Sequence, residues 1–509
     1  MIQQKKQKVV LIALYDKAAL GIRAVFSALK KEGVDVSVIF FKELAANNVK
    51  PPTETEIIIL ISLLKKLNPS IVGIGLRSSY FKIAVDLTRE IKKEIETPII
   101  WGGTHPTICP EDCIEHADIV CRGEGEYPMA DLVGKLSMGE SIENIENLWV
   151  RTEGRIAKNK MRPLIQNLDE LSLPIYDQDN EYVIEGNTVR RGIANEGQTK
   201  YTIMATRGCP FDCAFCGNNS LKKIYPQEKF VRWRGVGSVI EELKQAKQLF
   251  KCLRAVFFAD ELFVSDEKWL EDFLQKYKES IGLPFEADLH PNLIKEETIA
   301  ILKEAGLSSV TVGIQSGSEK TLYNVYKRYT PKKAILNMHK TLLKHKVRPS
   351  YDIILDNPLE DDDDKRETLN LLLQLDRPFI LHLYSLTHFP GTDLTQLLSQ
   401  KDLIKREDVE DMRAKTLTNW RMRLDGKSSA DDLFWNSLIS FTAHRLMPKF
   451  LISRMSGSRF LKRRPKPLVI LANIFRFIRI IELGMAMLAG GELNLPTVKK
   501  HIKNIKIVT

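Results

Sequence analysis

Three cysteines in the middle of the chain constrain its fold more than any other feature. Cys209, Cys213 and Cys216 follow the spacing Cys-x3-Cys-x2-Cys within residues 207–218. Three thiols cannot form a closed set of disulfides, and a structural zinc site takes four ligands. A cubane iron–sulfur cluster held by three thiolates keeps one iron open for a further ligand. The apolar run 201–205 predicts a strand before the triplet, so we expect the cysteines in a loop at a strand end, where barrel enzymes carry their chemistry.

Repeated strand–helix units follow along the middle of the chain. Short apolar segments predict six strands, at 201–205, 254–258, 285–287, 309–313, 350–354 and 379–384. Helical stretches separate them, at 239–250, 267–276, 296–304, 331–344 and 365–375. Units of this length close into a full or partial barrel with functional groups at the carboxyl ends of the strands.

Strands and helices also alternate in the N-terminal part. Apolar or β-rich runs predict strands at 9–14, 34–41, 71–75, 98–103 and 117–120, and helices at 18–32 and 81–93. Continuous apolar runs suit buried parallel strands. The pattern predicts a doubly wound α/β domain that binds ligands at its strand ends. From 136 to 198 we expect a connector with a short hairpin near Glu153-Gly154.

On its cysteine motif the chain resembles the radical S-adenosylmethionine (SAM) enzymes. The three cysteines stand at that family's cluster positions, Phe215 is its aromatic residue before the third cysteine, and Gly217 follows. The resemblance implies a [4Fe–4S] cluster whose open iron is chelated by SAM, and reductive cleavage of SAM to a 5′-deoxyadenosyl radical. It also implies a six-stranded partial barrel, here over residues 199–395. The alternatives are a chance cluster of cysteines and a redox pair.

Two strand ends resemble the SAM-binding segments of that family. Asp260 and Glu261 follow the second strand, where the family has Gly-Gly-Glu, and their carboxylates would accept the ammonium of SAM. Gln315, Ser316 and Gly317 resemble the Gly-Ile-Glu-Ser-Gly segment that meets the ribose and carboxylate of SAM. Gln315 replaces the usual Glu, so a neutral hydrogen bond would stand in for a charged one.

The N-terminal domain, over residues 1–135, resembles the cobalamin-binding domain found in one branch of the same family. Glycines there let the backbone approach a flat macrocycle. The matching residues are Ser78, Ser79, Gly102, Gly103, Thr104, His105, Gly123, Glu124, Gly125 and Glu126. The alternative is a Rossmann-like domain whose glycines bind a nucleotide or nothing. Some cobalamin domains carry Asp-x-His-x-x-Gly, but this chain has Ala18 at the His position. The resemblance therefore implies cobalt without a protein His ligand, and His105 is not expected to be one.

Several polar residues outside these motifs receive a simpler interpretation. Cys109, Cys113, Cys121 and Cys252 are expected to be ordinary buried thiols. His290 and His388 are candidates for proton handling or substrate contact. The acidic run 360–364 is expected to be a solvated loop and helix N-terminus, where negative charge suits the helix dipole.

The C-terminal region, residues 396–509, is expected to be helical and basic. No acidic residue lies between Asp432 and Glu482, whereas ten lysines and arginines do, among them Arg463, Arg464, Arg476 and Arg479. Arg476, Arg479 and Glu482 interrupt the apolar run too often for a membrane-spanning helix. The composition favours a helix lying on anionic lipid. A helix that packs on the barrel and a nucleic-acid patch are the alternatives; we expect no nucleic acid.

Length and composition agree with a multidomain enzyme. The 509 residues predict two to four domains, and 44% hydrophobic with 28% charged residues are typical of a globular protein. Seven cysteines and an oxygen-sensitive cluster favour a reducing compartment, so we expect a cytoplasmic protein, at the inner face of the membrane if the basic helix meets lipid.

The resemblance implies a cobalamin-dependent radical SAM enzyme that methylates an unactivated carbon of a hydrophobic or natural-product small molecule, with an external electron donor. One SAM would supply the methyl group through cobalamin, and a second would supply the radical. A cyclase or rearrangement enzyme of the same family is the first alternative. A corrinoid- or redox-sensing binding protein is the second, and it would not need the residues expected to bind SAM.

Overall fold

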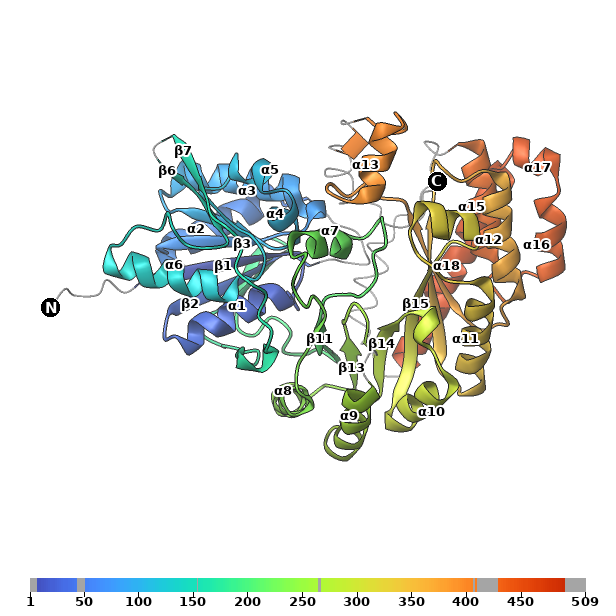
Figure 1. Cartoon of the computed structure of the whole chain (residues 1–509), viewed down its shortest axis with the longest axis horizontal. Coiled ribbons are helices and arrows are strands. Elements are labelled where there is room, and N and C mark those ends of the chain that lie inside the picture. Colours follow the sequence, from blue (N-terminus) through green and yellow to red (C-terminus); the bar gives the residue numbers. More distant parts are fainter. Residues whose placement is uncertain are drawn as a thin grey trace. The chain divides into compact units, whose positions relative to one another are not determined.

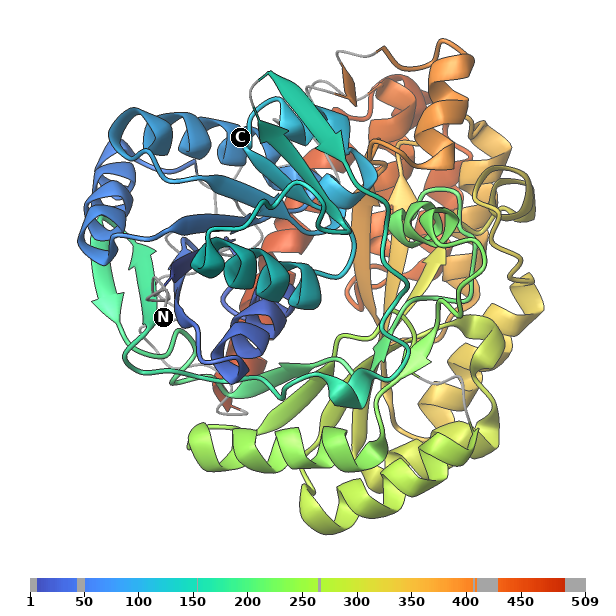
Figure 2. The same ribbon diagram turned by 60° about the vertical axis from the view of Figure 1, so that its left-hand side comes forward.

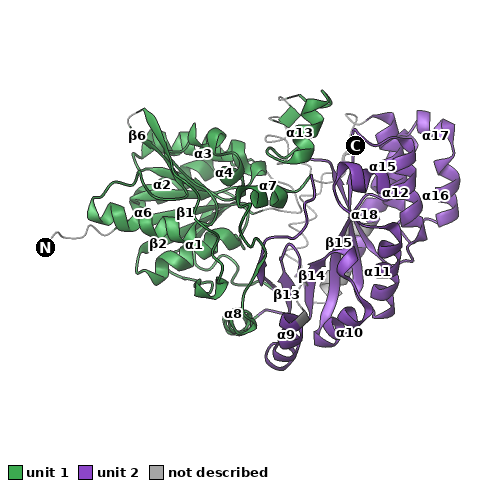
Figure 3. Cartoon of the chain, in the orientation of Figure 1, with its two compact units in different colours: residues 1–198, 215–251, 388–418 green, residues 199–214, 252–387, 419–509 purple. Residues whose placement is uncertain are grey.

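The computed structural model describes residues 7–43, 51–152, 154–263, 267–405, 408–409 and 429–489. The chain divides into two compact units (Figure 3). Unit 1 comprises residues 1–198, 215–251 and 388–418, and unit 2 comprises residues 199–214, 252–387 and 419–509.

Unit 1 is built on a nine-stranded sheet with the order β7-β6-β5-β4-β3-β1-β2-β8-β9 (Figure 1). Strands β1 to β5 and β8 run parallel, and β6, β7 and β9 are antiparallel to their neighbours. The strands are β1 (Lys8–Leu14), β2 (Asp35–Phe41), β3 (Ile71–Gly75), β4 (Ile99–Gly102), β5 (Ile119–Cys121), β6 (Leu148–Thr152), β7 (Arg155–Lys158), β8 (Glu181–Glu185) and β9 (Thr188–Arg191).

Alternate side chains of β1 enter two different hydrophobic cores, as the two-residue period of a strand requires. Val10, Ile12 and Leu14 pack with α2 and α3 on one face of the sheet. Val9, Leu11 and Ala13 pack with α1 and α6 on the other face. The helices are α1 (Leu20–Lys31), α2 (Glu54–Leu67), α3 (Phe81–Glu94), α4 (Thr104–Ile108), α5 (Pro110–Ile114) and α6 (Glu126–Met138). The expected doubly wound domain is confirmed.

The segment 136–198 differs from a simple connector. Strands β6 and β7 form the expected hairpin, and they extend one edge of the sheet beyond β5. Strands β8 and β9 extend the opposite edge beyond β2. Two charged side chains are buried where β8 joins the sheet. Arg23 of α1 and Glu181 of β8 form an ion pair there, with 2% and 0% of their side chains exposed.

Three helices from the later part of the chain also belong to unit 1. They are α7 (Gly217–Ile224), α8 (Val236–Leu249) and α13 (Asp393–Gln400), with the short strand β12 (Arg232–Trp233) before α8. The Asn219 amide donates to Asp393 at 3.0 Å, and the Ser220 hydroxyl donates to the Gly391 carbonyl at 2.8 Å. These bonds attach α7 to the start of α13. The domain limits expected from the sequence remain predictions.

Unit 2 contains a six-stranded, all-parallel sheet with the order β10-β13-β14-β15-β16-β17. The strands are β10 (Lys200–Ile203), β13 (Ala255–Phe258), β14 (Phe285–Leu289), β15 (Leu307–Gln315), β16 (Arg348–Leu355) and β17 (Ile380–Ser385). The helices that connect them are α9 (Glu267–Ser280), α10 (Glu296–Ala305), α11 (Lys332–Lys344) and α12 (Asp362–Gln374). Figure 2 shows α9 and α10 side by side along one face of this sheet. All six strands expected from the sequence are confirmed.

Four helices in the described part of unit 2 follow the sheet. They are α15 (Ala430–Phe441), α16 (Lys449–Ser456), α17 (Arg459–Arg463) and α18 (Lys466–Ala489). Helices α16, α17 and α18 pack against α15, which packs on α12 (Figure 1). The Trp435 indole donates to Asp362 at 2.9 Å, and Lys365 pairs with Asp432 at 2.6 Å. Among the described residues, no helix is long and apolar enough to cross a membrane.

Candidate functional site

The three cysteines of the motif lie in the loop between β11 (Thr206–Arg207) and α7. Gly208 opens the loop with a φ of 92°, a conformation that favours glycine. Cys213 is buried, Cys209 and Cys216 are half-buried, and Cys216 is the residue that caps α7. All seven cysteines of the chain lie in the described residues, and none forms a disulfide. The expected position after a strand end is confirmed.

The first two cysteines have a cationic neighbour. The guanidinium of Arg328 lies 3.5 Å from the Cys213 sulfur. Burial raises the pKa of the Cys209 thiol, and the neighbouring Cys213 adds to the rise. Within the described residues, no three His, Cys, Asp or Glu side chains converge on a point that would hold one metal ion. A cubane does not require such convergence, because each thiolate binds a different iron. Partly exposed thiols next to a buried cation suit an anionic cluster.

The two adjacent acids after β13 have different surroundings. Asp260 is 1% exposed and accepts a 2.6 Å hydrogen bond from the Thr206 hydroxyl, which ties the end of β13 to β11. Glu261 is exposed. We therefore assign Asp260 to holding the strand ends together, and Glu261 is the carboxylate that solvent and an ammonium group can reach.

The segment after β15 is fastened to α12. Gln315 ends the strand with a φ of 70°, which is unusual for a residue with a Cβ. The Ser316 hydroxyl donates to Glu360 at 2.8 Å, and the Gly317 amide donates to the Thr368 hydroxyl at 2.8 Å. Ser316 is 1% exposed. The serine and glycine thus hold a strained turn in place, and Gln315 is the residue that the turn presents.

The acidic run before α12 is more ordered than we expected. Asp361 caps the helix and forms a capping box with Asp364, as a helix N-terminus predicts. Asp364 is 4% exposed and accepts a 2.7 Å hydrogen bond from Ser318, and burial raises the pKa of Glu360 to about 7. The expectation of a fully solvated run is therefore wrong, because its first and last members bind the turn after β15.

A group of polar residues on the strands of unit 2 was missed by the sequence analysis. His382 of β17 lies 3.0 Å from Asp352 of β16, and the two residues are register partners. On β14, burial raises the pKa of Asp288 to about 7, and the negative charge of Asp352 adds to the rise. The alternation of Glu286 and Asp288 with apolar residues was the available signal, since it places both acids on one face of the strand.

The two candidate histidines lie in surroundings that disfavour the charged imidazolium. The His290 ring stacks on Phe211 of the cysteine loop, with ring centroids 3.9 Å apart. Burial lowers the pKa of His290 to about 3, and its Nδ1 accepts a 3.2 Å hydrogen bond from the Asn292 amide. Burial also lowers the pKa of His388. A neutral imidazole at either position would donate or accept a hydrogen bond rather than supply a charge.

In unit 1 the strand order reverses between β1 and β3, and ligands of doubly wound sheets bind at such a point. Asp16 follows β1 and accepts hydrogen bonds of 2.9 Å from the amides of Ala18 and Ala19. Arg77 follows β3 and lies 3.7 Å from Asp16. Ala18 thus occupies this edge with only a methyl side chain.

One serine of the expected cobalamin site, Ser78, is paired with the histidine of that site. The Ser78 hydroxyl lies 2.9 Å from His105 Nδ1, and the His105 ring packs against Phe81 with centroids 4.9 Å apart. His105 is 1% exposed and Ser79 is 4% exposed, whereas Ser78 is half-buried. Ser78 is therefore the one of these three residues that solvent can reach.

The two adjacent glycines at the end of β4 differ in whether a larger side chain would fit in their place. Gly103 has a φ of 109°, and a Cβ there would come 2.6 Å from the Leu76 carbonyl oxygen. A Cβ on Gly102 would meet nothing closer than the Cys121 Cβ at 3.8 Å. Gly102 would thus accept a Cβ without a clash, and it is partly exposed at the end of β4, beside exposed Thr104. A partly exposed glycine at the carboxyl edge of the sheet suits the approach of a flat macrocycle.

The loop after β5 is tied to the β12 segment. Gly123 has a φ of 73°, and a Cβ on it would collide with the Tyr225 hydroxyl. Glu124 pairs with buried Arg232 at 3.0 Å, and it accepts a 2.8 Å hydrogen bond from the Ile165 amide. Gly125 caps α6, and Glu126 begins that helix and is 4% exposed. The residue types at Gly123, Glu124 and Glu126 are therefore largely explained by packing and hydrogen bonds within unit 1.

The other cysteines were expected to be buried, and two of the four are. Cys113 and Cys121 are buried, and burial raises the pKa of Cys121 to about 12. Cys109 is half-buried, and Cys252 is exposed. The expectation for Cys252 is therefore wrong: it follows α8 in a turn, where the helix no longer covers it.

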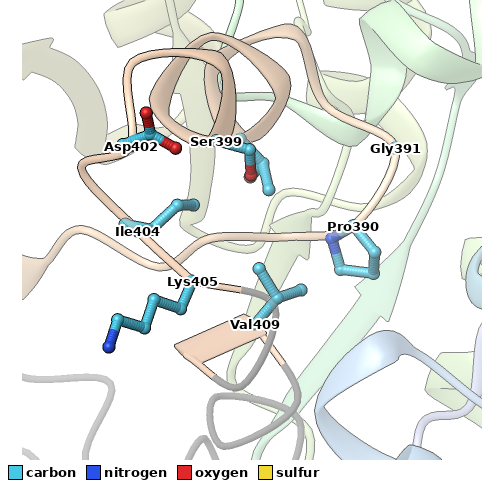
Figure 4. Close-up of a pocket in the computed structure, with 8 residues that line it drawn as sticks. Pro390, Gly391, Ser399, Asp402, Ile404, Lys405 and Val409 are labelled. Carbon is cyan, nitrogen blue, oxygen red and sulfur yellow. The ribbon is translucent and has the colours of Figure 1, made fainter.

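One surface pocket lies at α13 and the residues after it (Figure 4). It has a volume of about 650 Å³, and its lining includes Pro390, Gly391, Asp402, Ile404 and Lys405. None of the candidate site residues lines it.

Two family models match separate parts of the chain. The B12 binding domain matches residues 7–133, which hold β1 to β5, and the radical SAM superfamily matches residues 203–372, which hold the cysteine loop and β13 to β16. The chain belongs to the cobalamin-dependent radical SAM enzymes. Its cofactors are a [4Fe–4S] cluster, SAM and cobalamin.

Relatives of this radical SAM enzyme include methyltransferases and cyclases. It is 29% identical to an uncharacterised methyltransferase of Pyrococcus horikoshii, over 68% of this chain and 72% of the relative. It is 24% identical to bacteriochlorophyllide d C-8(2)-methyltransferase of Chlorobaculum tepidum, over 82% and 88%. It is 22% identical to anaerobic magnesium-protoporphyrin IX monomethyl ester cyclase of Synechocystis sp., over 78% and 82%. The chain is thus a methyltransferase-like enzyme.

Solved structures share the fold of this enzyme. The cobalamin-dependent SAM radical enzyme OxsB, with aqua-cobalamin and SAM bound, has a TM-score of 0.66 at 15% identity, and the match covers 98% of this chain and 84% of OxsB. The radical SAM methyltransferase TsrM of Kitasatospora setae, with cobalamin and a [4Fe–4S] cluster bound, has a TM-score of 0.62 at 17% identity, and the match covers 77% of this chain and 78% of TsrM.

Proposed function

We propose that this enzyme transfers a methyl group from SAM to an unactivated carbon of a hydrophobic small molecule. The three thiols in the loop after β11 carry the proposal, since they lie within the part of the chain that the radical SAM model matches and the chain also has a cobalamin domain. When bound, the cluster, SAM and cobalamin supply a carbon-centred radical and a transferable methyl group. The chain's own residues hold these groups and exclude water.

The proposed roles within residues 203–372, the part that the radical SAM model matches, divide between binding and support. Cys209, Cys213 and Cys216 hold the cluster, with Phe215 and Gly217 beside it. Exposed Glu261 accepts the ammonium of SAM, and Gln315 offers its amide to the ribose or carboxylate. Asp260, Ser316 and Gly317 support these two residues through the bonds described above.

The proposed cobalamin site uses the carboxyl edge of the unit 1 sheet. Ser78, Gly102 and Thr104 are partly or fully exposed at this edge, and the proposal places them nearest to the macrocycle. Gly103 is exposed beside them, and Ser79, His105, Gly123, Glu124, Gly125 and Glu126 shape the same edge through their packing and hydrogen bonds. Asp16 and Ala18 lie at the strand-order reversal, where no imidazole is available to the cobalt.

Cyclisation without methyl transfer is the second candidate, and the cyclases among the relatives favour it. The products separate the two. Candidate hydrophobic substrates would be incubated anaerobically with the reconstituted enzyme, a reductant and SAM carrying a deuterated methyl group. A methyltransferase gives a product heavier by that methyl group, with S-adenosylhomocysteine formed in step with 5′-deoxyadenosine. A cyclase gives 5′-deoxyadenosine but neither labelled product nor S-adenosylhomocysteine.

A row of exposed apolar residues on α18 supports a hydrophobic substrate. Five side chains, spaced by three or four residues and so on one helix face, are between 41% and 62% exposed: Ile470, Ile474, Phe477, Ile481 and Met485. The opposite face is packed, because Leu468 and Ala472 are 3% and 2% exposed and Phe475 contacts Phe441 and His444. We call these five residues the α18 stripe. A soluble domain rarely leaves such a row uncovered.

Exposed cations precede the α18 stripe in the chain, on α16, on and just after α17, and at the start of α18. Arg454, Arg459, Arg463, Arg464 and Lys466 are exposed, and within the described residues none of them forms an ion pair. Lys462 differs, since it pairs with Asp362 and Asp431. A segment that combines unpaired cations with exposed apolar side chains suits an anionic lipid surface. The proposal is that the enzyme rests on such a surface, from which it takes a lipid-like substrate.

A further inference from the structure

Arg328 is a buried cation whose position is fixed by its own segment. It follows the π-helical turn Thr321–Val325, and it is 9% exposed. Its Nη2 donates to the Gly313 carbonyl at 2.6 Å, and its backbone amide donates to the Leu322 carbonyl at 2.8 Å. Gly313 lies in β15, so the guanidinium is anchored to the sheet of unit 2.

The same segment holds the cysteine loop at two points. Arg328 Nη1 lies 3.5 Å from the Cys213 sulfur, and the Ala214 amide donates to the Tyr326 carbonyl at 2.8 Å. Cys213 is 6% exposed. The sulfur and the guanidinium therefore meet where little water screens their interaction.

The charge of Arg328 has no carboxylate to balance it. Among the described residues, no Asp or Glu oxygen lies within ion-pair distance of this side chain, and its Nε has no hydrogen-bond partner. A buried cation without a counter-charge is costly for a protein to keep. Besides the neutral carbonyl of Gly313, its polar neighbour outside its own segment is the Cys213 sulfur, which becomes anionic when it binds iron.

We propose that Arg328 is a positioning residue that holds Cys213 and raises the reduction potential of the cluster bound there. The proposal rests on the assignment of Cys213 as a cluster ligand. Reduction adds one negative charge to the cluster, and a fixed positive charge beside one of its sulfurs stabilises the reduced form more than the oxidised form. Hydrogen bonds to the sulfurs and local net charge are the properties through which proteins set these potentials.

The test is a potentiometric titration of the anaerobically reconstituted full chain, followed by the electron paramagnetic resonance signal of the reduced cluster, without SAM. Arg328→Gln removes the charge, and Arg328→Lys keeps it but cannot hold both Gly313 and Cys213. Lys327→Gln is the matched control, because Lys327 is exposed and next in sequence. At the wild-type midpoint, we expect the reduced-to-oxidised ratio of Arg328→Gln to fall about tenfold, which is about 59 mV for one electron. The midpoint potential of Arg328→Lys should lie between those of Arg328→Gln and the wild type, and the midpoint potential of Lys327→Gln should match that of the wild type.

Iron and sulfide contents are measured on the same samples, so that two failures can be told apart. A full cluster in Cys213→Ala would overturn the ligand assignment itself. A full cluster with an unchanged reduction potential in Arg328→Gln would overturn the proposed role of Arg328. The same holds if that variant also bound SAM more weakly, because the cation would then serve to bind the carboxylate of SAM. If Arg328→Gln assembled no cluster, Arg328→Lys would decide, and a wild-type potential there would contradict the proposal.

Discussion

Gly317 lies directly against the backbone of Thr368: a Cβ atom on the glycine would come within 2.5 Å of the Thr368 Cα. The turn after β15 therefore packs on α12 as backbone against backbone. This contact, together with the hydrogen bond from Ser316 to Glu360, fixes the direction in which Gln315 leaves the strand.

Gly317→Ala should lower the free energy of unfolding by about 1–3 kcal/mol, because two backbone segments would have to move apart. Gly237→Ala is the matched control, since a Cβ there would meet nothing within 4 Å, and we expect its stability to be unchanged or slightly higher. Denaturant titration of both variants measures the difference. Equal stabilities would show that the turn is not held by this contact.

Local patterns in the sequence predicted the sheet of unit 2 and the position of the cysteine loop. Each strand there is a short apolar run, and the motif that binds a cluster lies within eight consecutive residues, so both can be read without knowing tertiary contacts. The capping box of Asp361 and Asp364 is local in the same way.

Features that depend on pairing between distant strands could not be predicted. Strands β8 and β9 lie more than a hundred residues after β2, and their sequence does not indicate that β8 pairs with β2. The pair of Asp352 and His382 arises from the register of β16 on β17. The sequence also could not predict that Asp260 is buried and Glu261 is exposed, because the two acids are adjacent in the chain.

The raised pKa of Asp288 predicts how stability depends on pH. The folded pKa, about 7, lies above the ordinary value of 3.8, so the stability contributed by Asp288 is complete below about pH 4 and is lost as pH rises through 7. Asp288→Asn should remove this loss of stability, and the variant should exceed the wild type in free energy of unfolding by the largest amount near pH 8. Asp352→Asn removes a neighbouring negative charge and should move the loss to lower pH. Unfolding curves at pH 4 to 8 measure both, and an unchanged pH dependence in Asp288→Asn would refute the assignment.

Cobalamin should bind without an imidazole ligand, because Ala18 stands where some cobalamin domains have His. Electron paramagnetic resonance of the Co(II) form should therefore show no strong nitrogen splitting from an axial ligand. His105 is 1% exposed and bonded to Ser78, so His105→Gln should leave the spectrum unchanged. A nitrogen splitting that disappears in His105→Gln would mean that the cobalt lies on the other side of this edge.

Binding to lipid tests the α18 stripe. Vesicles with anionic headgroups should carry the protein in a flotation gradient, less so at high salt, since each Lys or Arg near the surface contributes about 1 kcal/mol. Arg463→Gln with Arg464→Gln should weaken flotation, and Ile470→Ser with Ile474→Ser should weaken it further. Lys31→Gln with Lys66→Gln is the charge-matched control on exposed helices of unit 1. A protein that ignores anionic vesicles at low salt would leave the lipid-like substrate without support.

The most direct test of the central claim needs no knowledge of the substrate. The full chain, reconstituted anaerobically with iron, sulfide and cobalamin, would be incubated with SAM and a reductant, and the mixture analysed for 5′-deoxyadenosine and methylcobalamin. We expect both products from the wild type. The triple variant Cys209→Ala, Cys213→Ala, Cys216→Ala should form no 5′-deoxyadenosine. A wild-type protein that holds a full cluster and cobalamin yet yields neither product would contradict the account.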